Sequence, residues 1–132
     1  MKIRYENLNE LLTIVAKVIY SEVVEDGEQY YRKLILEGDT LDSDKREYEW
    51  IEIMKFMSDS QKESLLRMIR QIIIDTVASV GGILNGDGYS GFDDLGIDLI
   101  IDGNSTEGCL TDAFLEYVED LAKKEQAAPG AM

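Results

Sequence analysis

The segment from Leu65 to Leu84 limits what this chain can fold into more than any other. Apolar residues cover most of the circumference that a helix would have here: Leu65, Leu66, Met68, Ile69, Ile72, Ile73, Ile74, Val77, Val80, Ile83 and Leu84. The polar residues follow at four-residue steps from Arg67 to Ser79, which confines them to one narrow stripe. A helix that is apolar nearly all round packs on several sides. We therefore predict a central buried helix over about residues 60–84.

Helical spacing of apolar residues also predicts a first helix, which runs from Leu8 to about Glu25 with Asn7 as its cap. Asp26-Gly27 is expected to break it. The next segment, Tyr30–Leu36, reads as a short helix or as the return strand of a hairpin that turns at Asp26-Gly27. We favour the helix, because the residues before the turn fit the helical period better than alternation.

A further helix is expected around Trp50, and Asp42–Asp44 offers caps for it. Trp50 and the nearby Tyr48 read as core anchors first and as interface anchors second. Two overlapping capping signatures, Ser58-x-x-Gln61 and Ser60-x-x-Glu63, predict that the central helix starts at one of these serines.

After the central helix the pattern changes. Apolar and acidic residues alternate from Ile97 to Asp102, which predicts a strand with a turn at Asp102-Gly103-Asn104. The last helix should turn one set inward (Leu110, Phe114, Leu115, Val118, Leu121) and another outward (Asp112, Glu116, Glu119, Asp120). The predicted fold is mainly α (α+β), with a short strand or hairpin near 95–103 and a C-terminal helix. We expect a single acidic domain over 1–126 and a flexible tail over 127–132.

Charge is distributed unevenly along this chain. It carries 27 acids against 13 bases, a net charge of −14, and no histidine. Between Arg70 and Lys123 there are eleven Asp and Glu residues and no Lys or Arg. Such a field repels nucleic acid and anionic membrane and speeds encounter with cationic surfaces. It predicts a basic protein partner, no nucleic acid and no membrane.

Metal and cofactor chemistry has little support in the sequence. With no histidine and one cysteine, a transition-metal site is not expected. Calcium loops beginning at Asn85 or Asp102 fail at the glycine of position six and the glutamate of position twelve. Turn-forming Asp and Gly explain these segments better, and we predict neither metal nor cofactor. Cys109 has no basic neighbour in sequence and reads as a small buried hydrophobe.

Catalysis is also disfavoured. Asp93-Asp94 and Asp98 are carboxylates of the type used in acid–base hydrolysis. The small size of the chain, its lack of histidine and the lack of an aromatic-lined cleft argue against that use. We therefore predict a protein that is not an enzyme.

Location follows from what the segments lack. The first residues have no continuous apolar core of a secretion signal, and charges interrupt the apolar run from Leu65 to Leu84. A single cysteine fits a reducing compartment. The cytoplasm is the expected location.

The remaining constellation is acidic and aromatic. The predicted partner-binding residues are Asp87, Tyr89, Asp93, Asp94, Asp98, Asp102 and Glu107. Carboxylates pair with Arg or Lys, and a tyrosine anchors an interface at little entropic cost. The alternative is a solvated acidic surface with Phe92 in the core.

Two segments also carry a resemblance. Leu66–Thr76 followed by Gly82–Gly86, a strand, and then Cys109–Glu116 resembles a group of small bacterial proteins, some of them immunity proteins encoded beside polymorphic or contact-dependent toxins. The resemblance covers the second half of the chain and implies a cytoplasmic inhibitor of a cognate toxin domain. It transfers no binding residue.

The leading hypothesis is thus an acidic immunity-type inhibitor of a basic partner, such as a nuclease toxin. The alternative is a structural or adaptor module, which a homodimer would suit. A small carboxylate-based hydrolase is the third class.

Overall fold

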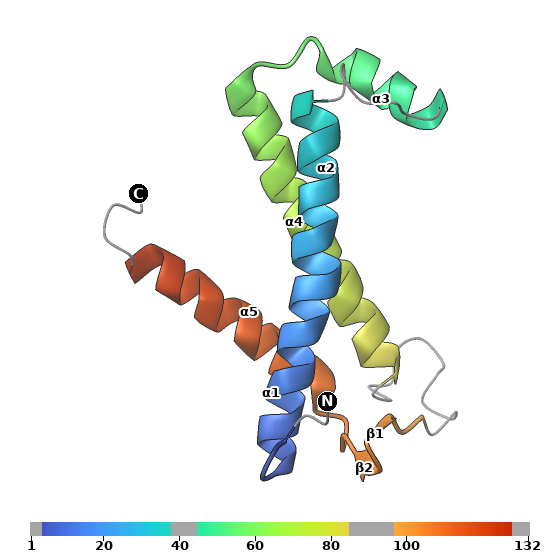
Figure 1. Ribbon diagram of the computed structural model, residues 1–132, viewed down its shortest axis with the longest axis vertical. Coiled ribbons are helices and arrows are strands. Elements are labelled where there is room, and N and C mark those ends of the chain that lie inside the picture. Colours follow the sequence, from blue (N-terminus) through green and yellow to red (C-terminus); the bar gives the residue numbers. More distant parts are fainter. Residues whose placement is uncertain (1–3, 38–44, 85–96, 128–132) are drawn as a thin grey trace. The chain divides into compact units, whose positions relative to one another are not determined.

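The computed structural model describes residues 4–37, 45–84 and 97–127, and the side chains of all of these but 45–48. Its elements are α1 (Leu8–Ile19), the π-helix η1 (Tyr20–Glu25), α2 (Asp26–Glu37), α3 (Lys45–Met54), α4 (Asp59–Leu84), β1 (Ile100–Ile101), β2 (Asn104–Ser105) and α5 (Leu110–Ala127) (Figure 1). The protein is mainly α with a short hairpin and a C-terminal helix, as predicted. None of the described helices is long and apolar enough to cross a membrane.

The chain divides into two compact units. The terminal unit combines Met1–Ser21 with Thr76–Met132, and the middle unit is Glu22–Asp75. The backbone passes from one to the other inside η1 and again inside α4. The single domain expected over 1–126 stays a prediction.

The first helix starts as predicted but does not end as predicted. The side chain of Asn7 accepts a hydrogen bond from the backbone N–H of Glu10 at 2.9 Å, which confirms the cap. The expected break at Asp26-Gly27 is wrong, because α2 begins at Asp26 and holds Gly27 in its first turn. A Cβ added at Gly27 would lie 3.1 Å from Cδ1 of Ile73, so this glycine permits a close approach to α4. The helix favoured for Tyr30–Leu36 is confirmed.

The start of α4 is fixed by a capping box. The backbone N–H of Ser58 donates to Oε1 of Gln61 at 2.8 Å, and the N–H of Gln61 donates to Oγ of Ser58 at 3.1 Å. Of the two overlapping signatures, the structure therefore uses Ser58-x-x-Gln61. The caps expected at Asp42–Asp44 lie outside the described residues.

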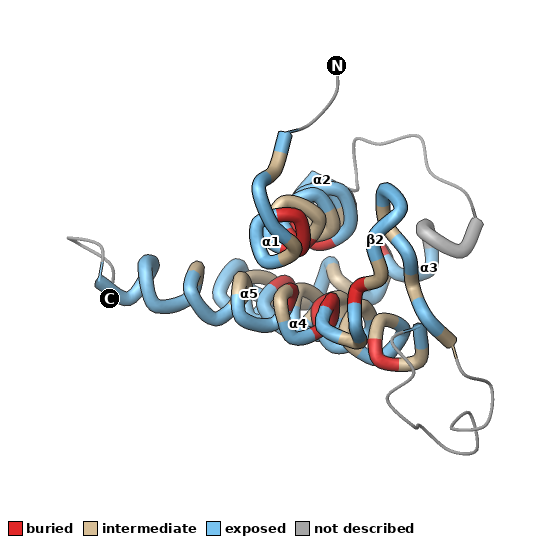
Figure 2. The backbone as a smooth tube through the Cα atoms, turned by 90° about the horizontal axis from the view of Figure 1, so that it is seen from below, coloured by how far each residue is buried: buried red, intermediate tan, exposed pale blue. Residues whose placement is uncertain are grey.

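α4 spans the predicted range, but burial on all sides is wrong. Leu66 and Ile74 are buried, whereas Met68, Ile72 and Val80 are each more than half exposed. Figure 2 shows exposed residues along much of α4. Leu66 and Ile74 lie eight residues apart and so share one helical face. The apolar composition raised the expectation of neighbours on every side, but composition does not supply them.

The core of the terminal unit forms where α1 packs against α5. Its buried apolar residues are Leu11, Leu12, Ala16, Tyr20, Leu110 and Phe114. Tyr20 and Tyr117 meet edge to face with ring centroids 5.5 Å apart. Leu115, predicted to point inward, is 41% exposed, so that prediction is wrong. The middle unit has its own core: Val24, Leu34, Ile35, Ile51, Leu66 and Ile74.

The predicted turn makes a tight hairpin. β1 and β2 are antiparallel, with Ile100 opposite Ser105 and Ile101 opposite Asn104. Asp102 and Gly103 both have positive φ, 50° and 76°, as a two-residue type I′ turn requires. The N–H of Thr106 donates to the carbonyl of Leu99 at 2.9 Å and extends the pairing beyond the strands.

Candidate acidic binding site

The structure describes three of the seven predicted partner-binding residues. Asp98, Asp102 and Glu107 lie on the hairpin and are exposed. The other four, Asp87, Tyr89, Asp93 and Asp94, lie outside the described residues, as does Phe92.

Two of the hairpin carboxylates are held by hydroxyl groups. Oδ1 of Asp98 accepts a hydrogen bond from the Ser105 hydroxyl at 2.8 Å. Oδ2 of Asp102 accepts one from the Tyr5 hydroxyl at 2.5 Å. Nδ2 of Asn104 donates to the same Tyr5 oxygen at 3.0 Å and to the backbone carbonyl of Asp102 at 2.9 Å. These contacts fix the turn in one orientation and leave both carboxylates charged at its surface.

Tyr5 is a site residue that sequence reasoning missed. The hydrogen bond to Asp102 is the main cause of a raised pKa for the Tyr5 hydroxyl, since ionisation would remove the donated proton beside a carboxylate. Ninety-seven positions separate the two residues. No local pattern in the sequence signals this contact.

The hairpin leads into α5 through a second left-handed turn. Glu107 and Gly108 have φ values of 51° and 70°. The N–H of Glu107 donates to the Ser105 hydroxyl oxygen at 3.1 Å, and the thiol of Cys109 donates to the Glu107 carbonyl at 3.4 Å. Cys109 is exposed, so its expected burial is wrong. The neighbouring Thr106 is fully buried, and no hydrogen-bond partner for its hydroxyl is found among the described residues.

A groove of about 340 Å³ lies between α1 and α5. Its lining residues are Asn9, Leu12, Thr13, Cys109, Asp112, Ala113, Glu116, Tyr117 and Asp120. Asp112, Glu116 and Asp120 follow at four-residue steps, so they form one row along α5. We call this feature the α1–α5 groove. It offers three carboxylates, the polar side chains of Asn9 and Thr13, and an aromatic ring.

The sequence contained part of this signal. The outward direction predicted for the acids of α5 is confirmed, because Asp112, Glu116, Glu119 and Asp120 are all exposed. Their four-residue steps were readable. That α1 supplies the facing wall of a groove was not, since only the packing of α1 on α5 decides it.

The field at this site is nearly unrelieved. From Ile97 to Ala122 the chain has seven acids and no base. Just beyond, Nζ of Lys123 lies 3.5 Å from Oε1 of Glu119, and both side chains are about two-thirds exposed. For the three groove acids no ion pair is found among the described residues.

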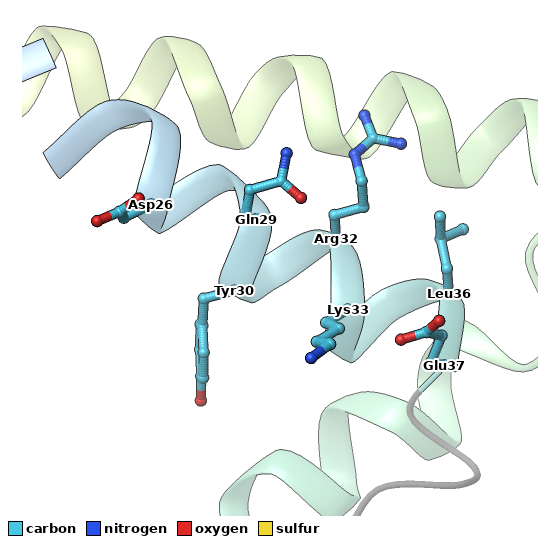
Figure 3. Close-up of a pocket in the computed structure, with 7 residues that line it drawn as sticks. All are labelled: Asp26, Gln29, Tyr30, Arg32, Lys33, Leu36 and Glu37. Atoms are coloured by element: carbon cyan, nitrogen blue, oxygen red, sulfur yellow. The ribbon is translucent and has the colours of Figure 1, made fainter. Parts of the chain in front are cut away.

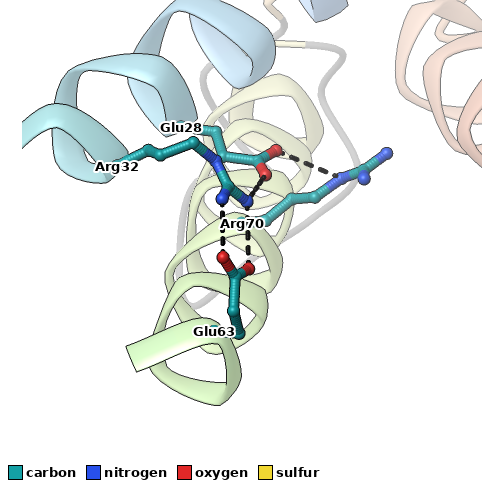
Figure 4. Close-up of polar contacts among 4 residues, drawn as sticks. All are labelled: Glu28, Arg32, Glu63 and Arg70. Atoms are coloured by element: carbon teal, nitrogen blue, oxygen red, sulfur yellow. Dashed lines mark hydrogen bonds and ion pairs between the residues drawn. The ribbon is translucent and has the colours of Figure 1, made fainter. Parts of the chain in front are cut away.

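The acids of the middle unit are in a different situation. Arg32 donates from Nη1 and Nη2 to the two carboxylate oxygens of Glu63 at 2.9 and 3.3 Å. Glu28 lies 3.5 Å from Arg32 and 3.8 Å from Arg70, which closes a four-residue network (Figure 4). The hydrogen bond to Glu63 is the first cause of the raised pKa of Arg32. These acids are neutralised within the protein and are poor candidates for binding an external cation.

A second hollow, of about 550 Å³, lies along α2. Its lining residues are Asp26, Gln29, Tyr30, Arg32, Lys33, Leu36 and Glu37, all from this one helix (Figure 3). Tyr30 and Lys33 extend from the side of α2 opposite Arg32. The charges are two of each sign, so this hollow has no strong electrostatic preference for a ligand.

The acidic site therefore has two adjoining parts, the hairpin acids and the α1–α5 groove, linked by the contact between Cys109 and Glu107. Among the described residues no group of three metal-binding side chains is clustered closely enough to hold an ion. The arrangement suits ammonium or guanidinium groups, which carboxylates bind by charge-assisted hydrogen bonds. Comparisons of the chain with protein families, curated proteins and solved structures gave no match.

Proposed function

We propose that this protein is a non-catalytic, cytoplasmic inhibitor of the immunity type, which binds a basic protein partner through the acidic site. The observation that carries the proposal is the α1–α5 groove, where three carboxylates in a row meet no base in a stretch of 26 residues, Ile97–Ala122. Successive carboxylates along α5 are about 6 Å apart, which suits a row of cationic side chains on a partner.

A nuclease toxin domain is the partner that this chemistry fits best. Nucleases bind the phosphate backbone through positively charged clefts, because nucleic acid is densely and regularly charged. An acidic protein surface competes for such a cleft. Opposite fields speed the encounter, and rim charges act mainly on the association rate. Inhibition would then follow from occupation of the cleft.

The hairpin supports the same proposal in another way. Asp98 and Asp102 are already oriented by Ser105 and Tyr5, so binding would not have to order them. A surface that is arranged before binding loses less conformational entropy when a partner arrives. The tight turn at Asp102-Gly103 presents these carboxylates on a rigid backbone.

The test replaces the three groove acids by their amides, Asp112→Asn, Glu116→Gln and Asp120→Asn. Tagged wild-type and variant proteins are used to capture partners from lysate of the source cells, with washes at low and high salt. We expect a basic partner with the wild type, lost from the variant or at high salt. The recovered partner is then assayed for nuclease activity with and without added protein.

A matched control removes the same amount of charge elsewhere: Glu22→Gln, Glu25→Gln and Glu49→Gln, all exposed in the middle unit. Net charge is then equal in the two variants, so a difference between them reports on the groove. Equal capture by both variants would sink the assignment of the groove. Recovery of no basic protein by the wild type would sink the inhibitor proposal itself.

Cys109 offers an independent readout. It is the single cysteine of the chain, it is exposed, and it lines the groove. Alkylation of the wild-type thiol should slow when the partner is bound and recover when salt releases it. An alkylation rate that the bound partner leaves unchanged would place the interface elsewhere.

A further inference from the structure

The middle unit exposes an apolar surface that the acidic site does not use. Phe56 is 92% exposed, Ile53 68% and Met68 54%. A groove of about 530 Å³ lies beside them, with apolar walls from Phe56, Met57, Leu65 and Met68. Exposed apolar groups on one contiguous surface are typical of interaction sites, whereas scattered ones are ordinary. We call this surface the Phe56 face.

The backbone holds Phe56 in this exposed position. The N–H of Phe56 donates to the Ile53 carbonyl at 3.4 Å, and the N–H of Met57 donates to the Met54 carbonyl at 3.0 Å. The capping box at Ser58 then starts α4. The turn between α3 and α4 is thus bonded on both sides of Phe56, and its side chain stays outside the core.

Charge around the Phe56 face is mixed, unlike the rest of this acidic chain. From Glu52 to Gln71 there are four bases and three acids. Lys55 pairs with Glu52 at 2.8 Å, and Nη2 of Arg67 donates to the Ser64 hydroxyl at 2.9 Å. Lys62 and Asp59 add one charge of each sign near the groove.

We propose that the Phe56 face binds a second copy of this chain in a two-fold symmetric homodimer. In such a dimer the same patch meets itself, so it must be self-complementary. The apolar groove and Phe56 supply complementary shapes, and a rim with both signs supplies complementary charge. Two copies that each carry −14 repel least where local charge is balanced.

This interface is separate from the acidic site and does not depend on the proposed function. A basic partner is directed away from the Phe56 face, because Lys55, Lys62 and Arg67 would repel it. A second copy of the chain meets an apolar centre that gains by leaving water. The aromatic anchor is of the type that dominates binding energy at such interfaces.

The test is the mass of the protein in solution, measured by sedimentation across about three decades of concentration at low and high salt. We expect a reversible change between 14.9 kDa and twice that mass, little affected by salt. Phe56→Ser combined with Met68→Gln should weaken dimerisation by about 30-fold or more, as for the loss of an aromatic anchor. Because both side chains are exposed, circular dichroism of the variant should match the wild type.

The control is Ile100→Thr, which removes an apolar side chain of similar exposure, 61%, from the hairpin in the terminal unit. It should leave dimerisation unchanged. A wild type that stays monomeric at every concentration would overturn the proposal, as would equal dimerisation of the Phe56→Ser/Met68→Gln variant. A dimer that dissociates in high salt would also overturn it, since that result assigns the contact to charge rather than to the apolar face.

Discussion

The two compact units of this protein treat charge and apolar surface in opposite ways. The terminal unit has thirteen acids and five bases, and its described acids on the hairpin and α5 are nearly unrelieved. The middle unit has fourteen acids and eight bases, and several of these are paired in a network on α2 and α4. Phe114 is buried in the terminal unit, while Phe56 is almost wholly exposed in the middle unit.

This contrast indicates two kinds of surface on one small chain. An unrelieved acidic groove favours a cationic partner at long range, whereas a charge-balanced apolar face favours contact only at short range. The large net charge is therefore not one property spread evenly over the molecule. It is a feature mainly of the segment after Arg70.

The largest expected effect compares the two phenylalanines. Phe114→Ala should lower the free energy of unfolding by about 3–5 kcal/mol, because it leaves a cavity where α1 packs on α5. Phe56→Ala should change it by less than about 0.5 kcal/mol, since that side chain is exposed. Urea denaturation of both variants makes the measurement. Similar losses for the two would mean that Phe56 is part of a core.

A smaller loss is expected at Gly81 in α4. A Cβ there would lie 2.5 Å from Oγ1 of the buried Thr111 on α5, so Gly81→Ala forces the two helices apart. Overpacking costs about 1–3 kcal/mol, which the better helix propensity of alanine offsets by about 0.5–1 kcal/mol. We expect a net loss of about 1 kcal/mol in urea denaturation.

Ser79→Ala is the matched control, because Ser79 is an exposed residue of the same helix. It should leave stability within about 0.5 kcal/mol of the wild type. A Gly81→Ala protein that is more stable than the wild type would show that α4 and α5 are not tightly packed at this point.

The acidic row on α5 gives a prediction of the opposite sign. Glu116 has acids four residues away on both sides, Asp112 and Asp120, and like charges at this spacing destabilise a helix. Glu116→Lys converts both pairs to attractive ones and should stabilise the protein by about 0.5–1 kcal/mol at low salt. The same substitution should abolish or strongly slow association with a basic partner.

Glu49→Lys changes the charge equally in the middle unit, where Lys45 lies four residues before it. It should not stabilise the protein. If Glu116→Lys stabilises no more than Glu49→Lys, the acids of α5 are not under mutual repulsion, and the contrast between the units loses its electrostatic basis.

The smallest effect concerns the pKa of Tyr5. The hydrogen bond to Asp102 raises it above the ordinary value of 10.0. The stability from this bond is therefore present below pH 10 and is lost as the pH rises through the folded-state pKa. Ultraviolet titration of wild type against Tyr5→Phe isolates this hydroxyl. Asp102→Asn should bring its pKa back toward 10.0, and an unchanged titration would show that the contact does not form in solution.

Much of the local structure was predictable. The cap at Asn7, the capping box at Ser58, the turn at Asp102-Gly103 and the helices of α4 and α5 follow from short-range patterns in the sequence. The break expected at Asp26-Gly27 failed because a close approach of α2 to Ile73 on α4 uses the glycine within a helix. The burial expected for Cys109 failed because its position after a left-handed turn leaves it at the surface.

The candidate site divides in the same way. Sequence alone determined that the segment after Arg70 is acidic, that the acids of α5 form a row, and that the hairpin turns where it does, because charge, helical period and turn geometry depend on neighbours in the chain. Tertiary structure alone decided that α1 closes a groove over that row, that Tyr5 holds Asp102, and that Phe56 stays exposed. Burial and distant contacts depend on which elements meet, and no local pattern encodes that.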